Sequence, residues 1–132
     1  MVSKIIRTSI TLPKDLVREL DAFVDSIKSD RSKVIQQAIR NFLSIPQEEE
    51  DMVSGSLMIV YDHNEHSLEE ELTDVQHRFI NLIISNTHIH LDEYKCLLTI
   101  FVRGRFRDIR NMINKITGKK GILMIKESLV KI

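Results

Sequence analysis

The first 45 residues constrain the fold most, because they encode too little structure to be stable alone. Residues 6–12 alternate in the way that a half-buried strand does, and two apolar stripes at helical spacing follow them. One strand and two helices in about 40 residues cannot bury enough surface, and a lone strand leaves its backbone edges unpaired. We therefore expect a dimer in which the strands of two chains pair antiparallel and four helices pack beneath them.

The polar face of that strand carries side chains that could read DNA. Arg7, Ser9 and Thr11 would each occur twice on the two-stranded ribbon. Such a ribbon fits the major groove, where arginine reads guanine and short hydroxyl groups read donors or acceptors. The alternative is that these three residues are only the solvated side of a strand, but the order strand-helix-helix favours DNA binding.

Two residues mark where the helices of this segment should begin. Pro13 ends the strand and suits the first position of the first helix. Ser32 is expected to cap the second helix, and the flanking Arg31 and Lys33 make that helix start suited to hold a backbone phosphate. Residues 5–44 resemble the ribbon-helix-helix family of DNA-binding repressors, and the resemblance implies a dimer that binds double-stranded DNA.

The placement of charge separates this segment from the rest of the chain. The 132 residues carry no formal net charge, which argues weakly against a nucleic-acid-binding protein. Residues 1–45 nevertheless hold eight Lys or Arg against five Asp or Glu, whereas residues 47–51 hold four acids and no base. We predict a DNA-binding domain at 1–46, an acidic linker at 47–54 and a second domain at 55–132.

Cysteine usage and hydropathy indicate where such a protein would work. A single cysteine, Cys96, excludes an intramolecular disulfide and fits a reducing cytoplasm. The chain has no apolar run of the roughly 18–20 residues that a membrane span needs. Residues 1–4 also lack the apolar core of a secretory signal. We expect a cytoplasmic protein with no membrane partner.

The second domain shows a regular alternation of strand and helix patterns. Its order is β-α-β-β-α-β, the split ferredoxin-like arrangement that small-molecule-sensing ACT domains share, so the predicted fold class is α+β. Ser67 and Glu70 are expected to form a capping box at the start of its first helix. The predicted elements are a strand at 55–61, a helix from 67 to about 84, strands at 86–91 and 94–103, a helix at 106–116 and a strand at 122–132.

Two histidines and the cysteine form a candidate metal site in this domain. His88 and His90 are two apart on a strand, so they project from one face. Cys96 joins them if it pairs with His90 across a hairpin whose loop has an odd number of residues, which Asp92 could begin through its side chain. Two imidazoles and a thiolate suit zinc, nickel or copper. The alternative is that all three are ordinary sheet residues.

Three other histidines have weaker local signals. His77 lies about 150° from the centre of the apolar stripe of its helix, at about 100° per residue, so it points to solvent or to another subunit. His63 and His66 follow the first strand of the domain as candidates for weaker surface metal binding, and solvated loop residues are the favoured interpretation.

The whole chain resembles the nickel-responsive NikR repressors. The segments that carry the resemblance are Val60–His63, Val75–His77, Leu82–Ser85 and Thr87–Asp92, together with Cys96. The resemblance implies that His88, His90 and Cys96 of one chain bind Ni(II) in a roughly square-planar site, which His77 from a facing chain completes. It further implies one Ni(II) per subunit, a homotetramer built as a dimer of dimers, and a palindromic operator that controls nickel uptake genes.

Three positions depart from the NikR pattern. Family members commonly hold a cation between domains with acidic residues where this chain has Lys33 and Gln37, which argues against a potassium-like site. Leu98 stands where a carboxylate often supports the metal ligands, so affinity or metal preference could differ.

Other functions have less support in the sequence. A ribbon-helix-helix regulator could sense a different metal, or an amino-acid-like ligand through its ACT-like domain. A toxin-neutralising protein would have a disordered tail, whereas residues 55–132 read as a folded domain. A metalloenzyme is disfavoured because no positioned general base, such as that of an HExxH helix, accompanies the cluster. We therefore predict a regulator and not an enzyme.

Overall fold

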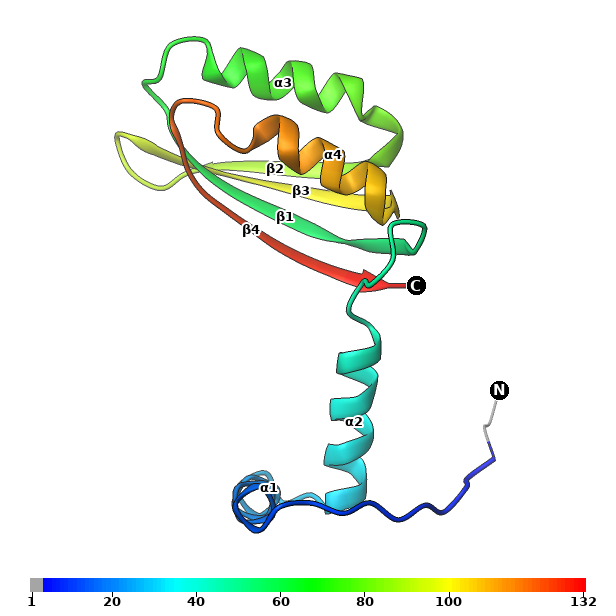
Figure 1. The fold of residues 1–132 in the computed structure, drawn as a ribbon. Coiled ribbons are helices and arrows are strands. Elements are labelled where there is room, and N and C mark those ends of the chain that lie inside the picture. Colours follow the sequence, from blue (N-terminus) through cyan, green and yellow to red (C-terminus); the bar gives the residue numbers. More distant parts are fainter. Residues whose placement is uncertain (1–3) are drawn as a thin grey trace. The chain divides into compact units, whose positions relative to one another are not determined.

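The computed structural model describes residues 4–132 and divides the chain into two compact units. Unit 1 is Met1–Phe42 and unit 2 is Leu43–Ile132, and each is described separately. None of the described helices is long and apolar enough to cross a membrane. The elements in chain order are α1 (Lys14–Ser26), α2 (Arg31–Leu43), β1 (Met52–Asp62), α3 (Leu68–Arg78), the short 3-10 helix η1 (Ile80–Leu82), β2 (Ile83–His90), β3 (Lys95–Arg105), α4 (Phe106–Ile116) and β4 (Ile122–Lys131) (Figure 1).

Unit 1 has very little core of its own. Val24 is the only buried apolar residue among its described positions, while Phe23, Ile39 and Phe42 on its helices are each more than half exposed. Residues 4–13 belong to no helix or strand, and Ile6 is 83% exposed. The predicted strand at 6–12 therefore does not form in a single chain, because a strand needs a partner to bond with. Its pairing with a second chain remains a prediction.

The helix starts in unit 1 differ from the prediction by one residue for α1 and by two for α2. Pro13 is the cap of α1 rather than its first helical residue. The predicted cap at Ser32 is wrong: α2 begins at Arg31, and the Asp30 carboxylate accepts a hydrogen bond from the backbone N–H of Lys33 at 2.9 Å. An aspartate suits this position because its charge also complements the positive end of the helix dipole.

Unit 2 is a four-stranded antiparallel sheet with both of its α-helices on one face. The strand order is β2-β3-β1-β4, which confirms the predicted β-α-β-β-α-β arrangement, and Figure 1 shows α3 and α4 over the same side of the sheet. Alternate residues of β1 and β3 point into the layer between sheet and helices. The buried core residues of unit 2 are Val53, Leu57, Ile59, Tyr61, Leu68, Leu72, Val75, Cys96, Leu98, Ile100, Val102, Ile109, Met112 and Ile116.

The first helix of unit 2 is shorter than predicted. The α-helix ends at Arg78 instead of near residue 84, and β2 already begins at Ile83, three residues earlier than predicted. Two consecutive β-branched residues, Ile83 and Ile84, favour the strand. Ser67 does cap this helix, but its backbone is in the left-handed region and its side chain makes no capping hydrogen bond, so the predicted capping box is absent.

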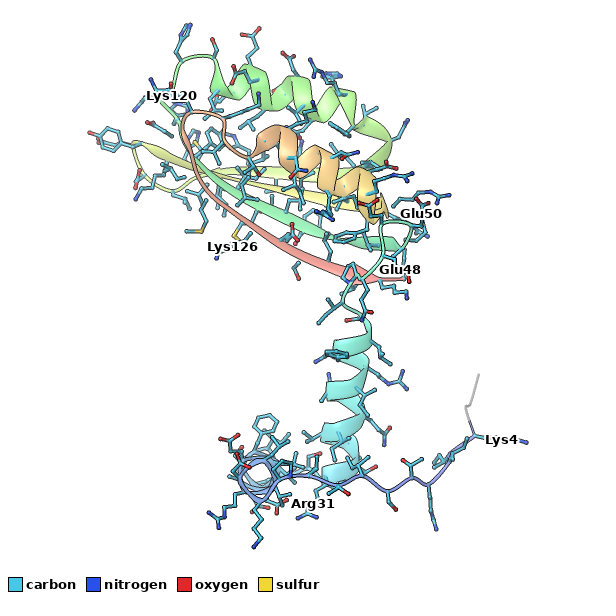
Figure 2. All side chains as sticks on the ribbon, viewed as in Figure 1. Lys4, Arg31, Glu48, Glu50, Lys120 and Lys126 are labelled. Atoms are coloured by element: carbon cyan, nitrogen blue, oxygen red, sulfur yellow. The ribbon has the colours of Figure 1, made fainter. Side chains whose placement is uncertain are left out.

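The acidic segment 47–51 belongs to unit 2 and is bound to its sheet and to α4. Glu50 pairs with Arg105, and with Arg107 at 2.5 Å (Figure 2 labels Glu50). The Asp51 carboxylate accepts hydrogen bonds from two backbone N–H groups of its own turn and pairs with Lys131 at 3.6 Å. These contacts tie the segment to β3, α4 and β4. The predicted end of the first domain at residue 46 and the predicted start of the second at residue 55 remain predictions.

Candidate metal centre

The hairpin between β2 and β3 holds the histidines and the cysteine in register. His90 lies directly opposite Cys96, and His88 lies opposite Leu98. Directly opposed residues share a face of an antiparallel pair, so all four side chains lie on one side of the sheet. It is the side that the helices cover, since Cys96 and Leu98 belong to the core. The pairing predicted for His90 and Cys96 is confirmed.

The turn of this hairpin explains the register. The Leu91 N–H donates to the carbonyl of Lys95 at 2.9 Å, which selects the tighter of the two possible odd loops. The Asp92 carboxylate accepts hydrogen bonds from the N–H groups of Tyr94 at 2.7 Å and Lys95 at 2.8 Å, as predicted. These bonds lower the pKa of Asp92, because they favour its charged form.

Cys96 occupies the middle strand of the three that build the site. Its neighbours across the strands are Tyr61 on β1 and His90 on β2. Its side chain is fully buried, and its Sγ lies 3.3 Å from Nδ1 of His90. Hydrogen bonds between backbones therefore fix the thiol and this imidazole relative to each other.

His63 also belongs to this cluster, whereas a solvated loop residue was the favoured interpretation of its sequence. It follows the end of β1, and its Nδ1 lies 3.5 Å from Sγ of Cys96. Its ring is 5.2 Å from that of His90, and its Nδ1 lies 3.0 Å from the Glu69 carboxylate on α3. The ligand atoms of His63, His90 and Cys96 all lie within 4.8 Å of one another. His66, in contrast, is exposed and outside this group.

A second, overlapping group contains His88. The ligand atoms of Glu69, His88 and Cys96 also lie within 4.8 Å of one another. The Tyr61 hydroxyl donates to Glu69 at 3.1 Å and lies 3.1 Å from Nε2 of His88. The rings of His88 and His90 are 5.1 Å apart. Tyr61 and Glu69 thus hold the imidazoles around the thiol. Leu98 stands where a carboxylate often supports the metal ligands, and in this chain the carboxylate beside the ligands comes from Glu69 instead.

The protonation of the site reflects burial first and neighbours second. Burial raises the pKa of the Cys96 thiol, the nearby Glu69 and Asp92 carboxylates raise it further, and a hydrogen bond from Tyr61 works against them. Burial together with Glu69 raises the pKa of Tyr61 far above its usual value. Burial also works to raise the pKa of Glu69, but hydrogen bonds from Tyr61 and His63 outweigh it and lower the pKa. The raised pKa favours the protonated thiol in the absence of metal, so an ion that bound Sγ would displace that proton.

His77 lies apart from these two groups. It is exposed on α3, as its angle from the apolar stripe predicts, and it contributes to neither of the groups of metal-ligating atoms found in residues 4–132. Cys96, His88 and His90 converge within one chain, whereas His77 does not join them.

The candidate DNA-contacting residues lie in unit 1. Arg7, Ser9 and Thr11 are exposed on the extended segment before α1. Ser32 and Lys33 are exposed in the first turn of α2, where Lys33 is 3.8 Å from the Asp30 carboxylate. These positions are open to a ligand.

Arg31 has a partner that the sequence did not reveal. Its guanidinium donates two hydrogen bonds, at 2.7 and 2.8 Å, to the Asp21 carboxylate on α1 (Arg31 is labelled in Figure 2). The bidentate pair lowers the pKa of Asp21 and raises that of Arg31. It joins the two helices of unit 1 and competes with any phosphate for the same guanidinium.

The fold and the site together define a class of protein: a transcription regulator with a ribbon-helix-helix unit and an α+β unit that offers histidine and cysteine ligands. Residues 6–45 match the family model of ribbon-helix-helix proteins of the copG family. Residues 54–130 match the model described as the NikR C-terminal nickel binding domain. The chain belongs to the NikR family, and it is a DNA-binding regulator with a nickel-binding domain, not an enzyme. Its imidazole and thiol donors are among those that nickel accepts.

Curated relatives are similar over nearly the whole chain. A protein of Saccharolobus solfataricus named "Putative nickel-responsive regulator" is 40% identical over 120 residues, which cover 89% of this chain and 87% of the relative. Two further proteins have the same name. The one from Pyrococcus furiosus is 32% identical over 89% of this chain and 88% of the relative. The one from Methanocaldococcus jannaschii is 33% identical over 94% of this chain and 91% of the relative.

Proposed function

We propose that this chain is a nickel-responsive repressor whose metal site is shared between two chains. His88, His90 and Cys96 of one chain bind Ni(II), and His77 of another chain supplies the fourth ligand, so that each subunit holds one ion. The observation that carries this proposal is the convergence of the first three side chains on one face of the sheet. His77 lies outside this cluster and is exposed on α3, where another chain can reach it. Nickel supplies a charge that favours the thiolate of Cys96 over the thiol.

Sharing a ligand requires an assembly, and we propose a tetramer built from two dimers. Unit 1 dimerises because its apolar side chains have no core to enter within one chain. Unit 2 carries partly exposed apolar side chains on the sheet face away from the helices, such as Met58, Phe101 and Met124. An apolar surface of this kind supports further association of unit 2 with other copies.

Metal binding would then act on DNA affinity through the assembly. Nickel can shift the protein only if it binds the DNA-competent arrangement better than the others. A ligand contributed by a second chain provides that preference, because it is in place only in certain arrangements of the subunits. In the DNA-bound state Arg7, Ser9 and Thr11 read bases of a palindromic operator, while Arg31, Ser32 and Lys33 contact phosphates.

We propose that the regulated genes are those of nickel uptake. A regulator that binds DNA when nickel is abundant and represses nickel uptake genes limits further uptake. A regulator of this kind works where the DNA is, so we place it in the cytoplasm.

The decisive experiment compares Cys96→Ala with the wild type. DNA sites are selected from a randomised pool with wild-type protein and Ni(II), and binding is then measured with and without the metal. We expect Cys96→Ala to keep its metal-free DNA affinity and to lose the nickel-dependent increase. His66→Ala, in the exposed loop, is the control and should respond normally. A full nickel response in Cys96→Ala would refute the proposed site.

The DNA-contacting role of Arg31 is testable through its partner. Asp21→Asn weakens the ion pair, so it should release Arg31 toward phosphate and tighten DNA binding severalfold, whereas Arg31→Ala should weaken it. The pair is exposed, so solvent screens it and its loss should change the stability of unit 1 only slightly. Weaker DNA binding in both variants would show that the pair serves only to join α1 and α2.

A further inference from the structure

One carboxylate lies among the candidate metal ligands without being one of the four ligands proposed above. Glu69, in the first turn of α3, is the only acidic residue in either group of metal-ligating atoms found in residues 4–132. We propose that Glu69 is a positioning residue for the nickel site: it holds the ring of His88 in place through Tyr61, and its charge offsets that of the ion. The proposal rests on the proposed function, because it concerns the same ligands.

A chain of two hydrogen bonds leads from Glu69 to His88. A carboxylate only accepts hydrogen bonds, so the single proton of the Tyr61 hydroxyl is directed to Oε1 of Glu69, at 3.1 Å. The hydroxyl oxygen can then accept a hydrogen bond from Nε2 of His88, also at 3.1 Å. The rings of Tyr61 and His88 are nearly parallel, with an interplanar angle of 17°. Because Tyr61 is buried in the core, it gives the exposed ring of His88 a fixed neighbour.

His88 needs such support because the strand beside it supplies none. His90 is held by its pairing with Cys96, whose Sγ lies 3.3 Å from Nδ1 of that imidazole. His88 instead lies opposite Leu98, whose side chain has no polar atom, and β2 is an edge strand of the sheet. An imidazole has a broad choice of angles about its second side-chain bond, so an unsupported ring takes several orientations. Holding the ring in one orientation before the ion arrives reduces the entropy that binding costs.

The charge of Glu69 acts on the same site. Ni(II) bound to one thiolate and to neutral imidazoles keeps one positive charge, which a nearby carboxylate neutralises. The ligand atoms of Glu69, His88 and Cys96 lie within 4.8 Å of one another, so this attraction acts over a short distance. Oε1 of Glu69 lies 3.1 Å from the Tyr61 hydroxyl and 3.0 Å from Nδ1 of His63, and these contacts keep the carboxylate beside the site. Glu69 therefore contributes both an anchor for Tyr61 and a compensating charge.

Substitutions in the full chain separate the two contributions, with nickel affinity measured by competition with a chromophoric chelator. Glu69→Ala removes the hydrogen bond and the charge, and it should weaken nickel binding roughly 10–100-fold, the usual cost of losing a residue that supports a metal ligand. Glu69→Gln keeps an oxygen that can accept the Tyr61 proton but has no charge, so its loss should be smaller. Glu70→Gln is the matched control: it removes the same charge from the same helical turn and should bind nickel as the wild type does.

Tyr61→Phe tests whether Glu69 acts through the hydroxyl group. If it does, Glu69→Ala should cost less nickel affinity in the Tyr61→Phe background than in the wild type, because the contact is already lost. Equal costs in the two backgrounds would contradict the positioning role.

Two measurements on the metal-free protein separate positioning from stability. NMR of the imidazole nitrogens should show one hydrogen-bonded state of His88 in the wild type and averaged signals in Glu69→Ala. Urea unfolding should be nearly unchanged, since the Glu69 side chain is 48% exposed. Unchanged His88 signals or unchanged nickel affinity in Glu69→Ala would overturn the proposal, as would equal losses of affinity in Glu69→Ala and Glu70→Gln. If Glu69→Ala behaves as the wild type while Cys96→Ala loses the nickel response, the positioning role fails and the shared nickel site stands.

Discussion

The two units of this chain solve the problem of burying apolar surface in opposite ways. Unit 2 places a contiguous core between one face of a sheet and two helices, using residues of a single chain. Unit 1 has two amphipathic helices and an extended segment, and Val24 is the only buried apolar residue among its described positions, 4–42. Folding and dimerisation are therefore one event in unit 1, while in unit 2 association can follow folding. A metal that joins chains through unit 2 can act on assembly without having to create the fold.

The largest effect should come from a charge placed in the extended segment of unit 1. Ile10→Asp removes an apolar side chain that would be buried in both halves of the dimer, at about 1.5–3 kcal/mol for each copy. Sedimentation should show loss of the dimer, and DNA binding should vanish, while unit 2 keeps its circular dichroism and its metal. Thr11→Asp is the matched control, because it lies on the polar face and should abolish DNA binding alone. A dimer that survives Ile10→Asp would contradict strand pairing.

A somewhat smaller effect is expected for a cavity in unit 2. Ile100 is fully buried on β3, so Ile100→Ala should lower the free energy of unfolding of this unit by about 2–5 kcal/mol. The neighbouring Phe101 is 42% exposed on the other face of the sheet, and Phe101→Ala should cost less stability but weaken association. Urea unfolding and sedimentation distinguish the two. Equal losses of stability would mean that both faces of the sheet are equally buried in solution.

The smallest effect concerns the pH dependence of unit 2. Hydrogen bonds from the N–H groups of Glu48 and Gln47, and the charge of Lys131, lower the pKa of Asp51. Its contribution to stability is present above the pKa of an unfolded aspartate, about 3.9, and is lost as the pH falls through the lower folded value. As the pH falls from about 5 to about 2, Asp51→Asn should therefore lose less stability than the wild type. Glu93→Gln, in the exposed hairpin turn, should behave as the wild type does.

Much of unit 2 was predictable because its local signals agree with its tertiary contacts. The helix at 106–116 has the predicted ends, and the pairing of His90 with Cys96 limited the hairpin to a loop with an odd number of residues. His63 could not be assigned in this way. It reaches Cys96 only because β1 pairs with β3 so that Tyr61 lies opposite Cys96, and no pattern in the sequence specifies the register between strands 33 residues apart.

Other differences arose where two local preferences compete. Asp30 and Ser32 are both good caps, and only the hydrogen bond to the N–H of Lys33 shows that the aspartate is used. The apolar stripe of the helix after Ser67 continues through Leu82, so periodicity alone could not show that the α-helix ends at Arg78. In unit 1 the predicted strand at 6–12 needs a second chain to pair with, so a single chain cannot show it.

The bound acidic segment has a consequence for how the protein can be divided. Its charge and its proline-flanked position suggest a flexible stretch that a protease would cut, and exposed flexible stretches are the usual sites of cleavage. Here the carboxylates of Glu50 and Asp51 are engaged by Arg105, Arg107 and Lys131. A protease should therefore spare residues 47–51, and a fragment that begins after them would leave those three cations without their partners.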